Sequence, residues 1–77
     1  TLKKSQFKEY SSKFLNDLGI KMSEKNEFDL AKGLFELAIN EDPIFYEPWK
    51  NLSKIIKDKD MSKSNTYKKI SENLNSE

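Results

Sequence analysis

The chain has 77 residues, of which 35% are hydrophobic and 35% charged, and it carries a formal net charge of +1 at pH 7. A chain of this length forms one small domain with a thin core, and its near-zero charge provides no general attraction to nucleic acid or anionic membranes. Cysteine and histidine are absent. That absence excludes disulfides, thiol nucleophiles, imidazole bases and the usual zinc ligands.

All 14 basic residues are lysine, which argues against sequence-specific nucleic-acid readout because arginine is the side chain best suited to bidentate base contacts. No stretch approaches the roughly 18 apolar residues that span a membrane, and no signal peptide is visible. We therefore predict a cytoplasmic protein with no membrane partner. Because the sequence begins at Thr1 without a methionine, we expect it to be a piece of a longer or processed protein.

The first predicted element is a helix over residues 5–25. Apolar residues three or four apart form one stripe along it: Phe7, Tyr10, Phe14, Leu18 and Met22. This is the spacing of an amphipathic helix. The alternative is a break at Ser11 and Ser12, where a serine side chain would cap a new helix near Lys13.

The second predicted helix covers residues 27–40, after a short turn at Lys25 and Asn26. Its broad apolar face comprises Phe28, Leu30, Ala31, Leu34, Phe35, Ala38 and Ile39. Asp42 precedes Pro43, and a residue before proline is driven away from the helical conformation. The helix is therefore expected to end before this pair.

The third predicted helix begins near Tyr46, with Pro48 in its first turn. Its apolar face comprises Trp49, Leu52, Ile55 and Ile56. A polar break at residues 58–62 separates it from a fourth helix over residues 63–73. The apolar stripe of that helix is sparse: Tyr67, Ile70 and Leu74. Four helices joined by short turns, without strand-like alternation, predict an all-α fold of antiparallel hairpins.

A 34-residue period relates the first predicted helix to the third. Leu15, Leu18, Gly19 and Met22 recur as Trp49, Leu52, Ser53 and Ile56. A fixed period of this size, in which apolar positions match apolar positions, is typical of helical repeat arrays.

The residues at these positions resemble the tetratricopeptide repeat (TPR) family. Its pattern places a large residue, a Leu-Gly pair and an aromatic residue on the first helix of the repeat. The second helix carries an alanine, an aromatic residue and another alanine, and a proline follows it. These positions hold Leu15, Leu18, Gly19, Met22, Ala31, Phe35, Ala38 and Pro43. The resemblance implies a single domain over residues 1–77, folded as a short right-handed superhelix of stacked hairpins. Residues 12–45 would form a well-matched repeat, residues 1–11 an N-terminal helix extension, and residues 46–77 a degenerate repeat with capping helices.

The second unit departs from the family pattern on its second helix. A strict 34-residue register would place Asn65 and Lys69 at the small and aromatic positions, whereas one extra residue in the turn would place Thr66 and Ile70 there. No closing proline follows, so we expect a polar capping helix. The alternative is a half-repeat class of RNA-processing scaffolds, which has a similar pattern of Ala, aromatic, Pro and Trp residues. The Leu-Gly pair disfavours it.

The resemblance implies a non-catalytic protein–protein interaction module that binds a peptide or partner protein in a groove lined by the first helices of its repeats. The matching positions are Lys13, Asn16, Ile20, Glu47, Lys50, Asn51, Lys54 and Lys57. Lys50, Lys54 and Lys57 recur at helical spacing, and such a basic stripe favours an acidic or C-terminal carboxylate ligand. The alternative is a solvated helix face.

Some members of the family hold the C-terminal carboxylates of chaperones through a lysine and an asparagine on the first repeat and an asparagine on the second. Asn51 matches the asparagine of the second repeat. Asn16 and Ile20 stand where the lysine and the asparagine of the first repeat are required, which disfavours binding of chaperone tails.

Other functions are weaker alternatives. The chain could be a structural segment that docks within a larger protein or forms a homo-oligomer, through Phe45, Tyr46 and Trp49 or through Phe7 and Tyr10. An RNA-associated helical repeat, with the lysine stripe against phosphates, is less favoured. An enzyme is not expected, because aspartate and glutamate are scattered without a second type of catalytic residue. No cofactor or metal is expected, and no glycine-rich phosphate-binding loop is present.

Overall fold

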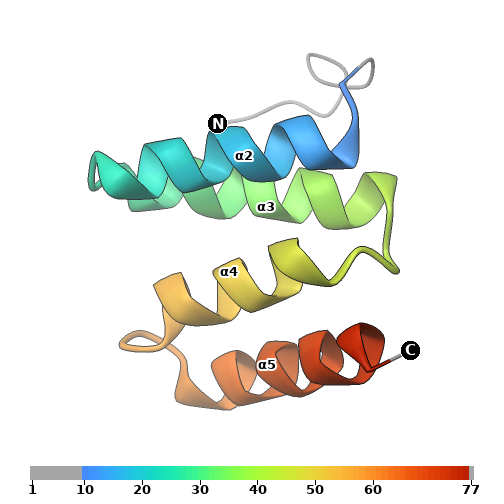
Figure 1. Ribbon diagram of the computed structural model, residues 1–77. Helices are drawn as coiled ribbons and strands as arrows, with labels where there is room; N and C mark the ends of the chain where they lie inside the picture. The colour runs from blue at the N-terminus through green and yellow to red at the C-terminus, as the bar shows by residue number, and fades with distance from the viewer. Residues whose placement is uncertain (1–9, 77) are drawn as a thin grey trace.

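The computed structural model describes residues 10–76, and these residues form four helices and no strand. The helices are α2 (Ser12–Glu24), α3 (Phe28–Glu41), α4 (Tyr46–Ile56) and α5 (Met61–Asn75). α2 and α3 lie side by side as one hairpin, and α4 and α5 form another below it (Figure 1). The predicted all-α architecture of helical hairpins is therefore confirmed.

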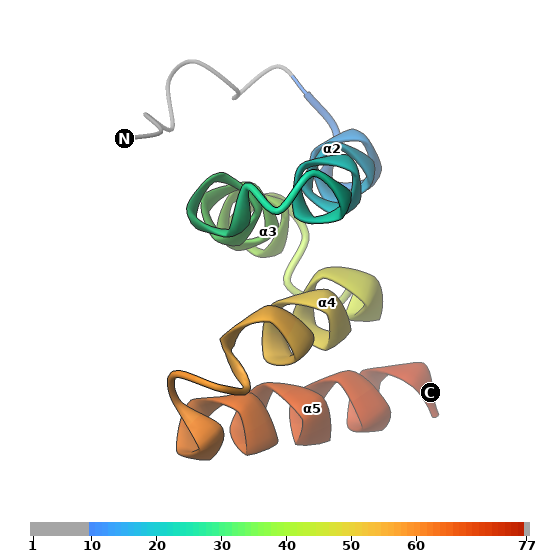
Figure 2. The ribbon, with the colours of Figure 1, turned by 90° about the vertical axis from the view of Figure 1, so that its left-hand side faces the viewer.

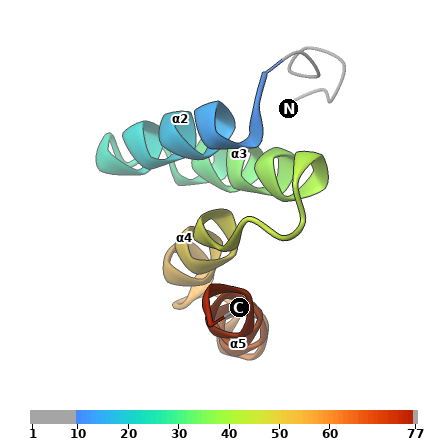
Figure 3. The ribbon, with the colours of Figure 1, turned by 45° about the vertical axis from the view of Figure 1, so that its right-hand side comes forward.

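The helix axes change direction along the stack. α5 is seen lengthwise in Figure 2, where α2 and α3 are seen almost end-on, and the reverse holds in Figure 3. α4 lies between the first hairpin and α5 in both views, and it contacts α2, α3 and α5. α4 is thus the element that joins the two hairpins.

α2 begins at the two serines and not at Ser5. Ser11 has an extended backbone (φ −69°, ψ 158°), and its Oγ accepts a hydrogen bond from the Phe14 amide at 3.1 Å. The predicted continuous helix is therefore wrong here, and the alternative break at the serines is confirmed. The physical reason is that a serine hydroxyl competes for a backbone amide and stabilises a helix start. Phe7 and the rest of the predicted extension before residue 10 lie outside the described residues.

The turn between α2 and α3 depends on Asn26, which adopts a positive φ of 64°. Asparagine tolerates this left-handed conformation better than most residues. The amides of Lys25 and Glu27 both donate to the carbonyl of Met22, at 3.1 and 2.9 Å. The predicted short turn at Lys25 and Asn26 is confirmed.

Two clusters of buried side chains form the core. One lies within the first hairpin and contains Leu15, Leu34 and Ala38. The other joins α3 to α4 and contains Ala31, Phe35, Leu52 and Ile56. Tyr67 of α5 packs against this second cluster, so the core continues from the first hairpin into the last helix.

Gly19 allows α2 and α3 to approach closely. A Cβ atom at this position would lie 2.6 Å from Cε1 of Phe35, which is far inside the van der Waals contact distance between carbon atoms. The Phe35 ring is 1% exposed. A side chain at residue 19 would therefore displace a buried aromatic ring.

α5 begins at Met61, two residues before the predicted start, because the Asp60 carboxylate accepts a hydrogen bond from the Lys63 amide at 3.0 Å and caps the helix. The predicted insertion in the preceding turn is wrong, since Thr66 is exposed. The buried small residues of α5 are Ser64 and Ser71, at 6% and 4% exposure.

These two serines correspond to Ala31 and Ala38, which have the same spacing on α3 and are also buried. A strict repetition of the period that relates α2 to α4 would place Asn65 at the position of Ala31, but Asn65 is exposed. The second hairpin is thus one residue shorter than the first.

We predict that Gly19→Ala destabilises the domain, whereas Gly33→Ala, the same change in the middle of α3, stabilises it. Both changes improve helix propensity by about 1 kcal/mol. Only Gly19 is crowded by Phe35, and overpacking of a core costs about 1–3 kcal/mol. Urea unfolding followed by circular dichroism compares the two free energies of unfolding. An increase in stability for Gly19→Ala would contradict the close crossing.

Candidate functional site

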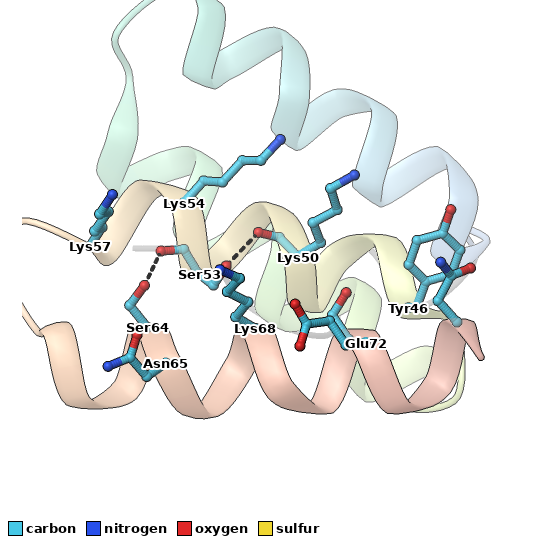
Figure 4. Close-up of a pocket in the computed structure, with 11 residues that line it drawn as sticks. Tyr46, Lys50, Ser53, Lys54, Lys57, Ser64, Asn65, Lys68 and Glu72 are labelled. Carbon is cyan, nitrogen blue, oxygen red and sulfur yellow. Dashed lines mark hydrogen bonds between the residues drawn. The ribbon is translucent and has the colours of Figure 1, made fainter. Parts of the chain in front are cut away.

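A groove of about 460 Å³ lies between α4 and α5. The residues that line it are Tyr46, Lys50, Ser53, Lys54, Lys57, Ser64, Asn65, Lys68, Ser71, Glu72 and Asn75. Lys57 and Tyr46 lie at opposite ends of the groove, whereas Lys50 and Lys54 extend from α4 between them (Figure 4). The predicted lysine stripe therefore forms one wall of a groove in the structure.

The floor of the groove contains Ser53, Ser64 and Ser71, and the hydroxyls of the first two form hydrogen bonds within the protein. Ser64 Oγ donates to the carbonyl of Ser53 at 2.7 Å, and Ser53 Oγ donates to the carbonyl of Lys50 at 2.8 Å (Figure 4). The first bond holds α5 close to α4, because serine is small and its hydroxyl reaches the facing backbone, whereas the second lies within α4. The hydroxyls of Ser53 and Ser64 are thus already engaged, and the long side chains that remain exposed are on the walls.

The walls carry a concentrated positive charge. Four lysines line the groove (Lys50, Lys54, Lys57 and Lys68), together with one acidic residue, Glu72. Among residues 10–76, the ion pair that forms joins Lys13 Nζ to Asp17 Oδ2 at 3.3 Å. No lysine of the groove is therefore paired with a carboxylate of these residues. The chain as a whole has a net charge of only +1. These ammonium groups give the groove a local excess of positive charge, which favours anions near it.

Asn16, predicted to face a partner, is instead buried between α2 and α4. Its side chain is 0% exposed. Its Nδ2 donates to Oε1 of Glu47 at 3.3 Å, and its Oδ1 accepts from Nδ2 of Asn51 at 3.0 Å. These three residues, all predicted to contact a ligand, thus hold two helices together. The structure gives Asn16 no surface with which to contact a partner.

The two other predicted residues of α2 also lie away from the lysine groove. Ile20 is half-buried and packs against the cluster around Phe35. Lys13 is exposed and forms its ion pair with Asp17 within the same helix. Such an exposed pair contributes little to stability. Of the eight predicted residues, only Lys50, Lys54 and Lys57 line the groove.

The sequence-based prediction missed the residues that α5 contributes to the groove. Lys68 and Glu72 lie on α5 opposite the lysines of α4 (Figure 4). The signal was the spacing between Ser64 and Ser71, which repeats the spacing between two buried alanines of α3. Aligning small residues with small residues would have placed Lys68 in the groove.

A second hollow, of about 440 Å³, is lined by residues of α3, α4 and α5 and of the turn after α4. Its charges are mixed, with acidic and basic residues in equal number: Asp29, Glu36, Asp58, Asp60, Lys32, Lys54, Lys59 and Lys63. It therefore lacks the charge bias of the first groove.

Two further types of site are not found in the described part of the chain. Within residues 10–76, no group of three or more acidic side chains lies close enough together to hold a metal ion. None of the helices of this part has both the length and the apolar character needed to cross a membrane.

Comparison with known proteins adds no family. No family model matches the chain, and neither curated proteins nor solved structures give a significant match. The resemblance to the TPR pattern therefore rests on the residues quoted above.

We predict that Asn16→Ala lowers the free energy of unfolding by about 1–3 kcal/mol, because Glu47 and Asn51 of α4 lose their hydrogen bonds to this buried side chain. Asn73→Ala is the matched control, since Asn73 is exposed on α5, and it should leave stability unchanged or slightly raised. Thermal unfolding of both variants measures the difference. Equal melting temperatures for the two variants would show that Asn16 does not join the hairpins.

Proposed function

We propose that this chain is a non-catalytic protein-interaction module of TPR type, which binds an acidic segment of a partner protein in the lysine-lined groove. The observation that carries the proposal is the set of four lysines around one groove, none of which forms an ion pair with a carboxylate of residues 10–76. Ammonium groups bind carboxylates as point charges and place few demands on ligand geometry. An acidic protein segment therefore satisfies the chemistry of the walls.

The strength of single ion pairs decides what kind of acidic segment binds. An exposed pair contributes only about 0.2–1 kcal/mol, so one carboxylate gives negligible affinity. A segment with several aspartate or glutamate side chains can contact Lys50, Lys54 and Lys68 together. This favours an internal acidic segment over a single C-terminal carboxylate, and the burial of Asn16 removes one position that such a carboxylate would need.

The same charges weigh against the alternative functions. Two copies meeting through this groove would place lysines against lysines, which disfavours a homodimer at this face.

Trp49, a candidate interface anchor, donates a hydrogen bond from Nε1 to the carbonyl of Pro43 at 2.9 Å. Its ring also lies against the Tyr67 ring, with centroids 5.6 Å apart. This tryptophan is thus engaged within the chain.

We predict that Lys50→Glu combined with Lys54→Glu leaves the fold intact and weakens binding of a flexible, fluorescein-labelled peptide rich in glutamate and serine by at least about tenfold. Both lysines are exposed, so their replacement removes no core contact. Fluorescence anisotropy measures the dissociation constant, and circular dichroism checks the fold.

Lys21→Glu combined with Lys25→Glu is the charge-matched control, because both lysines are exposed and lie outside the groove. It should retain most of the affinity. A single-stranded oligonucleotide of equal charge tests the nucleic-acid alternative, and it should bind more weakly than the peptide. Equal loss in both double variants, or tighter binding of the oligonucleotide, contradicts the proposed function.

A further inference from the structure

The face that carries the lysine groove corresponds in sequence to the face of the first hairpin on which α4 lies. The repeat period relates α2 to α4, and the buried serines of α5 align with the buried alanines of α3. The corresponding pairs are Asn16 with Lys50, Ile20 with Lys54, Phe35 with Lys68 and Ile39 with Glu72. The second member of every pair lines the groove.

In the first hairpin, a helix covers this face. Asn16 is bonded to Glu47 and Asn51 of α4. Phe35 forms a cluster with residues of α4, against which Ile20 and Ile39 also pack. The groove of the second hairpin is therefore the place that a further helix would occupy if the stacking of α4 on α2 and α3 were repeated once more.

The side chains at this place have changed from mainly apolar to mainly basic. Ile20 and Phe35 pack against α4, whereas Lys54 and Lys68 at the corresponding positions line an open groove. A helix that placed an apolar face here, as α4 does against Phe35, would bury ammonium groups without a partner, which is costly. A helix with carboxylates on one face would pair with them, and its short side chains could approach the serine floor.

We propose that the groove binds an α-helix with an acidic face, supplied by a partner protein and lying across α4 and α5 as α4 lies across α2 and α3. The proposal rests on the proposed function and adds the conformation of the ligand. Aspartate or glutamate residues three and four apart on that helix would meet Lys50, Lys54 and Lys68. The aliphatic stems of the lysines would cover its small apolar residues.

Two peptides of about 15 residues and identical charge test the inference. In the first, glutamates occupy one face of an alanine-rich helix that a hydrocarbon staple holds in shape. In the second, the staple is omitted and a central proline breaks the helix. Fluorescence anisotropy with the complete 77-residue chain measures both dissociation constants. We expect the stapled helix to bind at least about tenfold more tightly, because the broken peptide must be ordered on binding.

A pair of double variants locates the binding surface. Lys54→Glu combined with Lys68→Glu should abolish binding of the stapled helix, whereas Lys21→Glu combined with Lys25→Glu should leave it within about threefold. Circular dichroism shows whether each variant is folded. The change at Lys68 is decisive, because this residue of α5 lines the groove and corresponds to Phe35, which packs against α4 in the first hairpin.

The outcomes separate this inference from the proposed function. Equal affinity for the two peptides, lost in Lys54→Glu with Lys68→Glu, overturns the helical ligand and leaves an acidic ligand in the groove. Absence of binding by both peptides, or equal weakening in both double variants, overturns the acidic-ligand function and the helical ligand together.

Discussion

The Phe35 side chain lies where three helices meet. Its ring fills the space that Gly19 leaves open on α2, and it forms one buried cluster with Leu52 and Ile56 of α4. The same side chain therefore closes the first hairpin and attaches the second hairpin to it. The direction in which α4 lies across the first hairpin, and thus the position of the open groove, depends on this contact.

The open groove lies on the face of the α4–α5 hairpin that corresponds in sequence to the α2–α3 face covered by α4. In this chain the α4–α5 face is built differently from the corresponding face of α2 and α3. Serines replace alanines on the floor, and lysines replace Ile20 and Phe35 on the walls. This face is thus more polar than the corresponding face of α2 and α3, and it carries the positive charge on which the proposed acidic ligand depends.

The four helices could be predicted from the sequence because apolar residues recur at helical spacing, and the lysine stripe because its spacing places three ammonium groups on one face. The break at Ser11 was predicted only as the alternative, since the apolar stripe runs through it and a local hydroxyl–amide bond decides the helix start. The burial of Asn16 and Ser64 was missed for a related reason. Each is polar, and each is buried only because another helix supplies its hydrogen-bond partner.

The contact of the Phe35 ring with two helices is the feature to measure first. A nuclear Overhauser spectrum of the labelled chain in solution reports which protons lie near the ring. We expect cross-peaks from the Phe35 ring protons to the α protons of Gly19 and also to the methyl groups of Leu52. Cross-peaks to Gly19 without any to α4 would show that the hairpins do not stack in this way, and the correspondence between the covered face and the lysine groove would be lost.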